Sequence, residues 1–287
     1  MIRRAALSLL LVLLSTSAVV AEPFRKPITN PKYDPAAGRV ELFAGMEGES
    51  LEVTLRLKNE FGGNLFVRNR TDKPLTVLMP AAMVGVQIHP QFGGGGLGGG
   101  QGGLGGGQGG GGLGGQNQAV GGGVGGGGLG GGGGLGGQGG GAGGGFFSIP
   151  PAETVRVPFR SVCLEHGKRS PTSRNSYTVV AVERYSAQPE LATLCEAVAS
   201  GTVNSSVAQA AAWHIGSGMS WDDLARKTFD QAGAADTPYF SREHLMAAVQ
   251  LVAASRTLAA ERSSARPESS ASRTTSAASP GESPSKR

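Results

Sequence analysis

Apolar and polar residues alternate with a period of two on both sides of the chain's centre, a pattern that predicts half-buried β-strands. The alternation runs through residues 40–44, 51–57, 65–67 and 84–88, and it resumes at residues 146–149, 155–162 and 177–182. Each part alone is too short to bury a sufficient core. Together they supply about seven short strands, so we expect one immunoglobulin-like β-sandwich built from both parts.

After residue 188 the apolar period changes from two to three or four, which predicts helices. Leu191, Leu194 and Val198 fall on one face of a first helix. Residues typical of helix ends mark the other boundaries: Gly201 fits the end of the first helix, Asn204 to Ser206 are candidate caps of the second, and Gly216 or Gly218 would end it. Ser220 and Ser241 would open two further helices. The expected fold class is therefore β + α, a β-sandwich followed by a small helical subdomain.

An uncharged tract from residue 93 to residue 145 holds most of the chain's 50 glycines and separates the two β-rich parts. Glycine loses more backbone entropy on folding than any other residue and has no side chain to bury, so we expect the tract to be disordered. Closing a flexible loop of this length costs only about 3–4 kcal/mol. We interpret the tract as an insertion between two strands of one sandwich that is available for self-association. A linker between two domains is the alternative.

Both ends of the chain are predicted to lie outside the fold. Arg3 and Arg4 precede an apolar run over residues 5–14, and Ala21 fits a cleavage site, which together indicate a signal peptide; an uncleaved anchor helix is the alternative. The Ser-, Ala-, Arg- and Pro-rich end has no large apolar residue to bury. The expected organisation is a signal peptide (1–21), an extended segment (22–38), the first part of the sandwich (39–92), the glycine-rich insertion (93–145), the second part of the sandwich (146–186), the helical subdomain (187–262) and a disordered tail (263–287).

The charge of the chain argues against nucleic-acid binding. The net charge is +5, and Arg3 and Arg4 leave with the signal peptide, so the mature chain carries +3. Its basic residues are scattered and only 6% of the residues are aromatic, whereas nucleic-acid surfaces need clustered basic groups and stacking partners. No second apolar stretch reaches membrane length, so we expect no transmembrane anchor after cleavage. The expected location is secreted, periplasmic or on the cell surface.

Cys163 and Cys195 are the only two cysteines. In an exported protein an even number predicts a disulfide, here one that would join the end of the sandwich to the first helix; two buried free thiols are the alternative. Cys163 and His166 have the local spacing of zinc ligands, but Cys195 and His214 lack a matched second pair. We therefore predict no metal site, no cofactor and no catalytic group.

Two short strings, VCLEHG at residues 162–167 and AQAAAWHI at residues 208–215, are similar to the two motifs of bacterial surface thioester domains. In that family a Cys on a strand condenses with a Gln on a helix and ammonia is lost, so that a nucleophile on a target surface can attack the stored acyl group. The resemblance implies that Cys163 and Gln209 are the bonded pair. Ala208 stands where the motif has Thr. Three further residues are expected to support this site: Trp213, His166 and His214.

Longer strings resemble uncharacterised secreted glycine-rich proteins of planctomycete-type bacteria: NRTDKPLTVLMPAAMVGV, VCLEHGKRSPTSRNSYTVV and AQAAAWHIGSGMSWDDLARK. This resemblance implies export and a shared fold, but no activity. Because no acidic and basic residues cluster as in an enzyme, we expect a non-enzymatic interaction or structural protein of the cell envelope or extracellular space. Its partner would be an unidentified protein or surface. The alternative is a covalent surface adhesin that uses a Cys163–Gln209 thioester.

Overall fold

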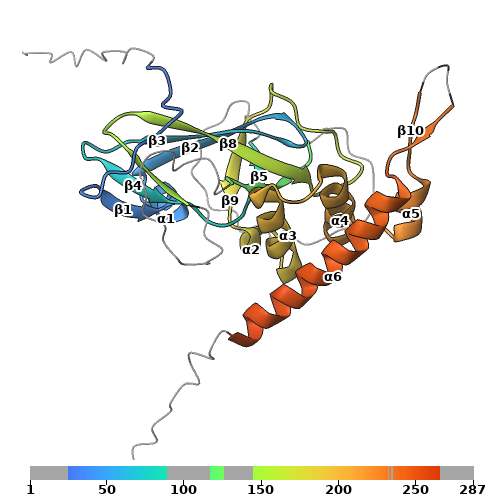
Figure 1. The fold of residues 1–287 in the computed structure, drawn as a ribbon. Coiled ribbons are helices and arrows are strands. Elements are labelled where there is room, and N and C mark those ends of the chain that lie inside the picture. The colour runs from blue at the N-terminus through green and yellow to red at the C-terminus, as the bar shows by residue number, and fades with distance from the viewer. Residues whose placement is uncertain (1–24, 89–116, 126–144, 232, 234, 266–287) are drawn as a thin grey trace, which may run out of the picture.

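The computed structural model describes residues 25–88, 117–125, 145–231, 233 and 235–265, and Figure 1 shows their arrangement. The strands form a barrel with a small accessory sheet, and the helices of the C-terminal part gather on one side of this barrel (Figure 1). The expected signal peptide lies outside the described residues. So do residues 266–287 of the expected tail and residues 93–116 and 126–144 of the glycine tract.

Six antiparallel strands close into the barrel. Their order is β2 (Leu51–Asn59), β3 (Gly62–Asn69), β8 (Thr154–Cys163), β6 (Val120–Gly123), β5 (Met83–Gln87) and β9 (Tyr177–Val180), and β9 returns to β2. Alternate side chains point inward, so Leu55, Leu65 and Val157 are completely buried. The period of two predicted these strands because each barrel strand has one inner and one outer face.

The expected immunoglobulin-like sandwich is wrong. A sandwich keeps two facing sheets with separate edges, but here β9 pairs with both β2 and β5, and β6 pairs with both β5 and β8. These pairings join the edges into one closed sheet. The sequence pattern located most strands but carried no information about which edges meet.

A second, three-stranded sheet lies beside the barrel. Its strand β4 (Leu75–Leu78) pairs in parallel with β1 (Gly38–Glu41) and antiparallel with β7 (Phe146–Ile149). The helix α1 (Leu42–Glu47) follows β1 directly, so the strand expected over residues 40–44 is wrong in its second half. Leu42 and Gly45, three positions apart, are its buried residues, which is the spacing of a helix.

Three helices of the C-terminal part, α3, α4 and α5, begin or end at residues that the sequence predicted as candidate caps or stops. Gly201 adopts the left-handed conformation at the end of α3 (Pro189–Ser200), with φ of 71°. Asn204 Oδ1 accepts hydrogen bonds from two backbone N–H groups at the start of α4 (Ser205–Ser217). The other C-terminal elements are α2 (Val182–Tyr185), α5 (Trp221–Arg226), the hairpin of β10 (Thr228–Phe229) and β11 (Thr237–Pro238), and α6 (Arg242–Ala265).

The helix α6 is the longest described helix and runs along α3 and α4 (Figure 1). It continues to Ala265, three residues beyond the expected start of a disordered tail after residue 262. Over the part of the chain that the structure describes, no helix has the length and apolar character needed to cross a membrane.

The centre of the glycine tract belongs to the barrel core. All four residues of β6 are buried, and the strand lies between β5 and β8. A Cβ added to Gly121 would lie 2.5 Å from Cys195 Sγ, and one added to Gly123 would lie 2.9 Å from Ala199 Cβ. Glycine thus allows α3 to pack directly on the strand. The expectation that the whole tract is disordered is wrong for residues 117–125, because strand pairing and helix packing stabilise a segment that lacks large side chains.

Gly122 tests this role of the tract. A Cβ at this position would lie 1.9 Å from the backbone oxygen of Arg160 on β8, which cannot rotate away. We expect Gly122→Ala to lower the free energy of unfolding by about 1–3 kcal/mol, as overpacking does. Urea denaturation measures this loss. Gly38→Ala is the control, because its new Cβ would be 3.7 Å from the nearest atom, Leu75 Cδ2. Equal stabilities of the two variants would contradict the placement of β6.

Candidate functional site

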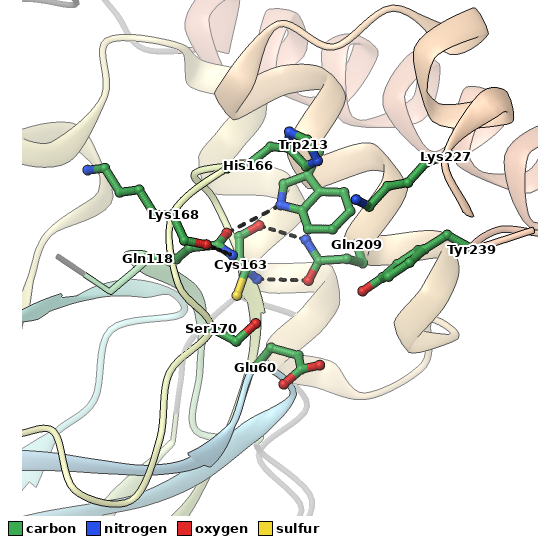
Figure 2. A pocket seen from close by; sticks show the side chains of 11 residues that line it. Glu60, Gln118, Cys163, His166, Lys168, Ser170, Gln209, Trp213, Lys227 and Tyr239 are labelled. Carbon is green, nitrogen blue, oxygen red and sulfur yellow. Dashed lines mark hydrogen bonds between the residues drawn. The ribbon is translucent and has the colours of Figure 1, made fainter. Parts of the chain in front are cut away.

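The structure brings Cys163 and Gln209 into direct contact (Figure 2). The backbone N–H of Cys163 donates to Gln209 Oε1 over 2.9 Å, and Gln209 Nε2 donates to the backbone oxygen of Cys163 over 2.8 Å. Each residue is only 1% exposed. The carboxamide is therefore held at both ends against the backbone of the cysteine, 46 positions away in the chain.

The lengths of two neighbouring strands explain this contact. The β3–β8 ladder ends where Gly62 pairs with Arg160, so β8 continues beyond the end of its neighbour. Cys163, the last residue of β8, is left with a backbone N–H and C=O that need partners because they are buried. The side chain of Gln209 supplies both partners, in the place where a further strand residue would otherwise pair.

The alanine-rich sequence of α4 allows the helix to approach β8 closely. The three alanines Ala210, Ala211 and Ala212 are completely buried. Near the end of the helix, a Cβ on Gly216 would lie 2.8 Å from the backbone oxygen of Leu164. Gly216 is seven positions after Gln209 and so lies on the same helix face, where its missing side chain brings the helix near enough for Gln209 to reach the strand backbone.

Trp213 forms an aromatic wall beside the Cys163–Gln209 pair (Figure 2). Its ring packs edge-on against His166, with centroids 4.8 Å apart, and lies 5.5 Å from the ring of Tyr239. Lys227 Nζ sits 5.4 Å from the Trp213 ring centroid and 5.1 Å from that of Tyr239, which favours a cation–π interaction with both.

Gln118, a residue of the glycine tract, fixes the indole of Trp213. Its Oε1 accepts a hydrogen bond from Trp213 Nε1 over 3.4 Å, and its Nε2 donates to the backbone oxygen of Lys168. The next residue, Ala119, donates its N–H to Glu165 Oε2. Sequence reasoning missed Gln118. The signal available was the break in the glycine pattern at QNQAV (residues 116–120), which is the longest run without glycine in the tract.

These residues line a cavity of about 330 Å³. It collects groups from the barrel, the tract and the helical part: Glu60, Gln118, Cys163, His166, Gly167, Lys168, Ser170, Gln209, Trp213, Lys227 and Tyr239. In Figure 2 the sulfur of Cys163 is directed toward the side of the cavity where Ser170 and Glu60 lie, while the carboxamide of Gln209 lies beside the cysteine backbone.

The cavity holds its thiol in the neutral form. Burial raises the pKa of Cys163 to about 12, and the negative charges of Glu60 and Glu165 act in the same direction. Burial also lowers the pKa of His166, as does the charge of Lys227, so His166 is a neutral imidazole at pH 7. Cys163 is therefore not a thiolate nucleophile of the kind that His-paired cysteine enzymes use.

The two cysteines are buried free thiols in the structure, so the expected disulfide is not formed. Cys195 lies on α3 and faces Gly121 of β6, whereas Cys163 ends β8 and contacts Gln209 of α4. The alternative of two buried core thiols describes this arrangement.

The two histidines occupy different surroundings. His214 stacks on Trp221, with ring centroids 4.2 Å apart, and its Nδ1–H donates to the backbone oxygen of Met219 at the end of α4. Its role is local packing, whereas His166 lines the cavity. Within the described residues, no three His, Cys, Asp or Glu side chains are grouped as metal ligands.

Comparison with protein-family models, curated proteins and solved structures finds no match for this chain.

Gln118→Ala tests the link between the glycine tract and the aromatic wall formed by Trp213. The variant leaves the indole N–H of Trp213 and the backbone oxygen of Lys168 without their partner, and an unpaired buried group costs about 1–3 kcal/mol. We expect a loss of stability of that size in urea denaturation, together with a change in tryptophan fluorescence. Gln250→Ala on the exposed face of α6 is the matched control and should change neither. A Gln118→Ala variant that behaves like this control would contradict the contact.

The buried thiol of Cys195 should make the fold less stable in alkali. Burial raises the pKa of this thiol from 9.0 to about 12, so the thiol stabilises the fold fully below pH 9 and this contribution is lost as the pH rises toward 12. Between pH 8 and pH 10 the thiol should lower the free energy of unfolding by about 1 kcal/mol. Urea titrations at both pH values should show a smaller decrease for Cys195→Ala. Equal decreases would contradict a free Cys195 thiol, since a disulfide has no proton to lose.

Proposed function

We propose that this protein is an exported covalent-capture protein, in which Cys163 and Gln209 form an internal thioester that reacts with a nucleophile on a target surface. The observation that carries the proposal is the pair of hydrogen bonds between the Gln209 carboxamide and the Cys163 backbone. It places the electrophilic carbon of one residue beside the residue that bears the thiol. The resemblance to thioester domains named the same two residues, and the contact supports that resemblance independently.

The geometry favours attack on the carboxamide. The N–H of Cys163 points at Gln209 Oε1, the atom that gains negative charge when a nucleophile adds to Cδ. A donor already aimed at a developing oxyanion stabilises the transition state, and more strongly where water is excluded. For bond formation, Cys163 Sγ must turn about the Cα–Cβ bond from the orientation in Figure 2 toward Cδ of Gln209.

Both steps of the proposed chemistry balance without an oxidant or a cofactor. First, the Sγ–Cδ bond forms and the Cδ–Nε2 bond breaks; the thiol proton leaves with the nitrogen, and ammonia is released. Second, an amine of the target adds to Cδ and the Cδ–Sγ bond breaks. Cys163 regains a proton as a thiol, and the target is held through an amide bond at Gln209.

Burial protects the stored acyl group. Cys163 and Gln209 are almost completely buried, and Trp213 lies over them with the rings of His166 and Tyr239 around it. Exclusion of water slows hydrolysis, the reaction that would waste the thioester. The cavity nevertheless reaches the surface, since His166 and Lys168 in its lining are exposed. A target side chain can enter from there.

The non-enzymatic interaction protein expected from the sequence is the second candidate. The same two hydrogen bonds satisfy the Cys163 backbone whether or not a thioester forms, so the contact also has a structural role. In that case the cavity and its aromatic wall bind a partner without a covalent bond.

Intact-mass spectrometry separates the two candidates. We expect the mature protein to be lighter than its sequence mass by one ammonia, because the thioester forms when Nε2 of Gln209 leaves. Methylamine should then raise the mass by one methylamine, and peptide mapping should place it on Gln209. Cys163→Ala should abolish both changes. Cys195→Ala is the matched control, because it removes the other buried thiol and should preserve both.

The remaining outcomes are also decisive. Conversion of Gln209 to glutamate that depends on Cys163 would indicate a thioester that had hydrolysed. A full sequence mass with Gln209 intact would contradict the thioester and leave the non-covalent interaction protein. A mass short by two hydrogens would show a Cys163–Cys195 disulfide and would also contradict it.

A further inference from the structure

Glu60 enters the cavity from a part of the chain that neither sequence motif includes. It lies between β2 and β3 and lines the same cavity as Cys163 and Gln209 (Figure 2). Ser161 on β8 holds this turn in place, since its hydroxyl donates to the backbone oxygen of Glu60 over 2.9 Å and its N–H donates to that of Phe61 over 3.1 Å. Ser161 precedes Cys163 by two positions on the same strand, so the position of Glu60 is coupled to that of the thiol.

The carboxylate of Glu60 has no ionic partner within the described residues. Lys168 pairs with Glu165 over 2.5 Å, and Lys227 lies against the rings of Trp213 and Tyr239. The hydrogen bonds of the described residues likewise reach only the backbone oxygen of Glu60. Its charge is therefore available to a group that enters the cavity.

The negative charge of Glu60 acts on groups across the cavity. After burial, Glu60 is the largest cause of the raised pKa of Cys163, and it also raises the pKa of Tyr239. In Figure 2 the Cys163 sulfur and the Glu60 carboxylate lie on the same side of the cavity. A nucleophile that approaches the thioester from this side meets the carboxylate.

We propose that Glu60 is the catalytic base of the capture step: it binds the ammonium group of the incoming amine and takes one of its protons. This proposal rests on the proposed function, because it needs the Cys163–Gln209 thioester as the electrophile. It adds a residue and a source of specificity to that function.

The proton balance assigns Glu60 one defined step. A target ammonium cannot attack, since its nitrogen has no free electron pair. Transfer of one proton to Glu60 frees the pair, and the amine then adds to Cδ. The second N–H proton of the adduct passes to Sγ as the Cδ–Sγ bond breaks, which gives an amide and the neutral thiol that the cavity favours. Glu60 then releases its proton to solvent.

With this role for Glu60, capture of a charged amine depends on Glu60 more strongly than capture of an uncharged nucleophile does. An ammonium needs both attraction and proton removal, whereas a nucleophile that is uncharged at the working pH needs neither. General bases contribute about 10²–10⁴-fold to reactions of this kind. The ratio of the two rates therefore measures the role of Glu60 separately from the integrity of the site.

The experiment compares methylamine, which is an ammonium at pH 7.5, with hydroxylamine, which is uncharged, on intact protein that carries the thioester. We expect Glu60→Gln to retain the mass deficit of one ammonia, to react with methylamine about 10²-fold more slowly than the unaltered protein, and to react with hydroxylamine at a rate within about twofold of it. Glu60→Asp should recover part of the methylamine rate. Glu52→Gln, on the exposed face of β2, is the control and should change neither rate.

Each other outcome has a separate meaning. If Glu60→Gln slows the reactions with methylamine and hydroxylamine equally, or slows neither reaction, the role of Glu60 is overturned while the thioester itself stands. A thioester in the unaltered protein but not in Glu60→Gln would assign Glu60 to thioester formation and also overturn this role. Absence of the mass deficit from the unaltered protein would instead contradict the proposed function.

Discussion

The pairing of β6 between β5 and β8 is the constraint on which the rest of the structure depends. This strand closes the barrel, and three of its four residues are glycines. Its stability comes from backbone pairing on both edges, because a glycine strand contributes almost no side-chain burial. The missing side chains have a use, since Gly121 and Gly123 let α3 pack directly on the strand. The same segment supplies Gln118, which fixes Trp213 over the site. One short stretch of the tract therefore joins barrel, helices and cavity.

The site depends on the rule that buried backbone groups must be hydrogen-bonded. Cys163 extends beyond the end of its neighbouring strand, and Gln209 satisfies its N–H and C=O from a helix. Either residue alone would leave a buried polar group unpaired, at a cost of about 1–3 kcal/mol. Within the described residues no buried side-chain N or O atom lacks a partner. The contact that stabilises the packing of α4 on β8 is also the contact that places a carboxamide beside a cysteine.

Sequence reasoning succeeded where the cause is local. The barrel strands β2, β3, β5 and β8 follow the apolar alternation, and Gly201, Asn204 and Ser220 mark helix ends through their own backbone and side-chain bonds. Short motifs also single out Cys163 and Gln209, which are in contact in the structure. Sequence reasoning failed for α1, for the expected sandwich and for the centre of the tract. In each of these places the local structure depends on which distant segments meet. In addition, β6 has no apolar alternation of its own that would predict a strand.

The amino-acid sequence by itself therefore determined the positions of most strands and helices, the uncharged and glycine-rich character of the central tract, and the two residues of the candidate thioester. These properties follow from side-chain pattern, backbone preference and motif, all of which act over a few residues. Only the tertiary structure decided that the sheet closes, that residues 117–125 complete it, and that Gln118 and Glu60 join Cys163 in one cavity. Closure and cavity arise from pairings between residues far apart in the chain, whose free energy depends on how all of the segments pack together.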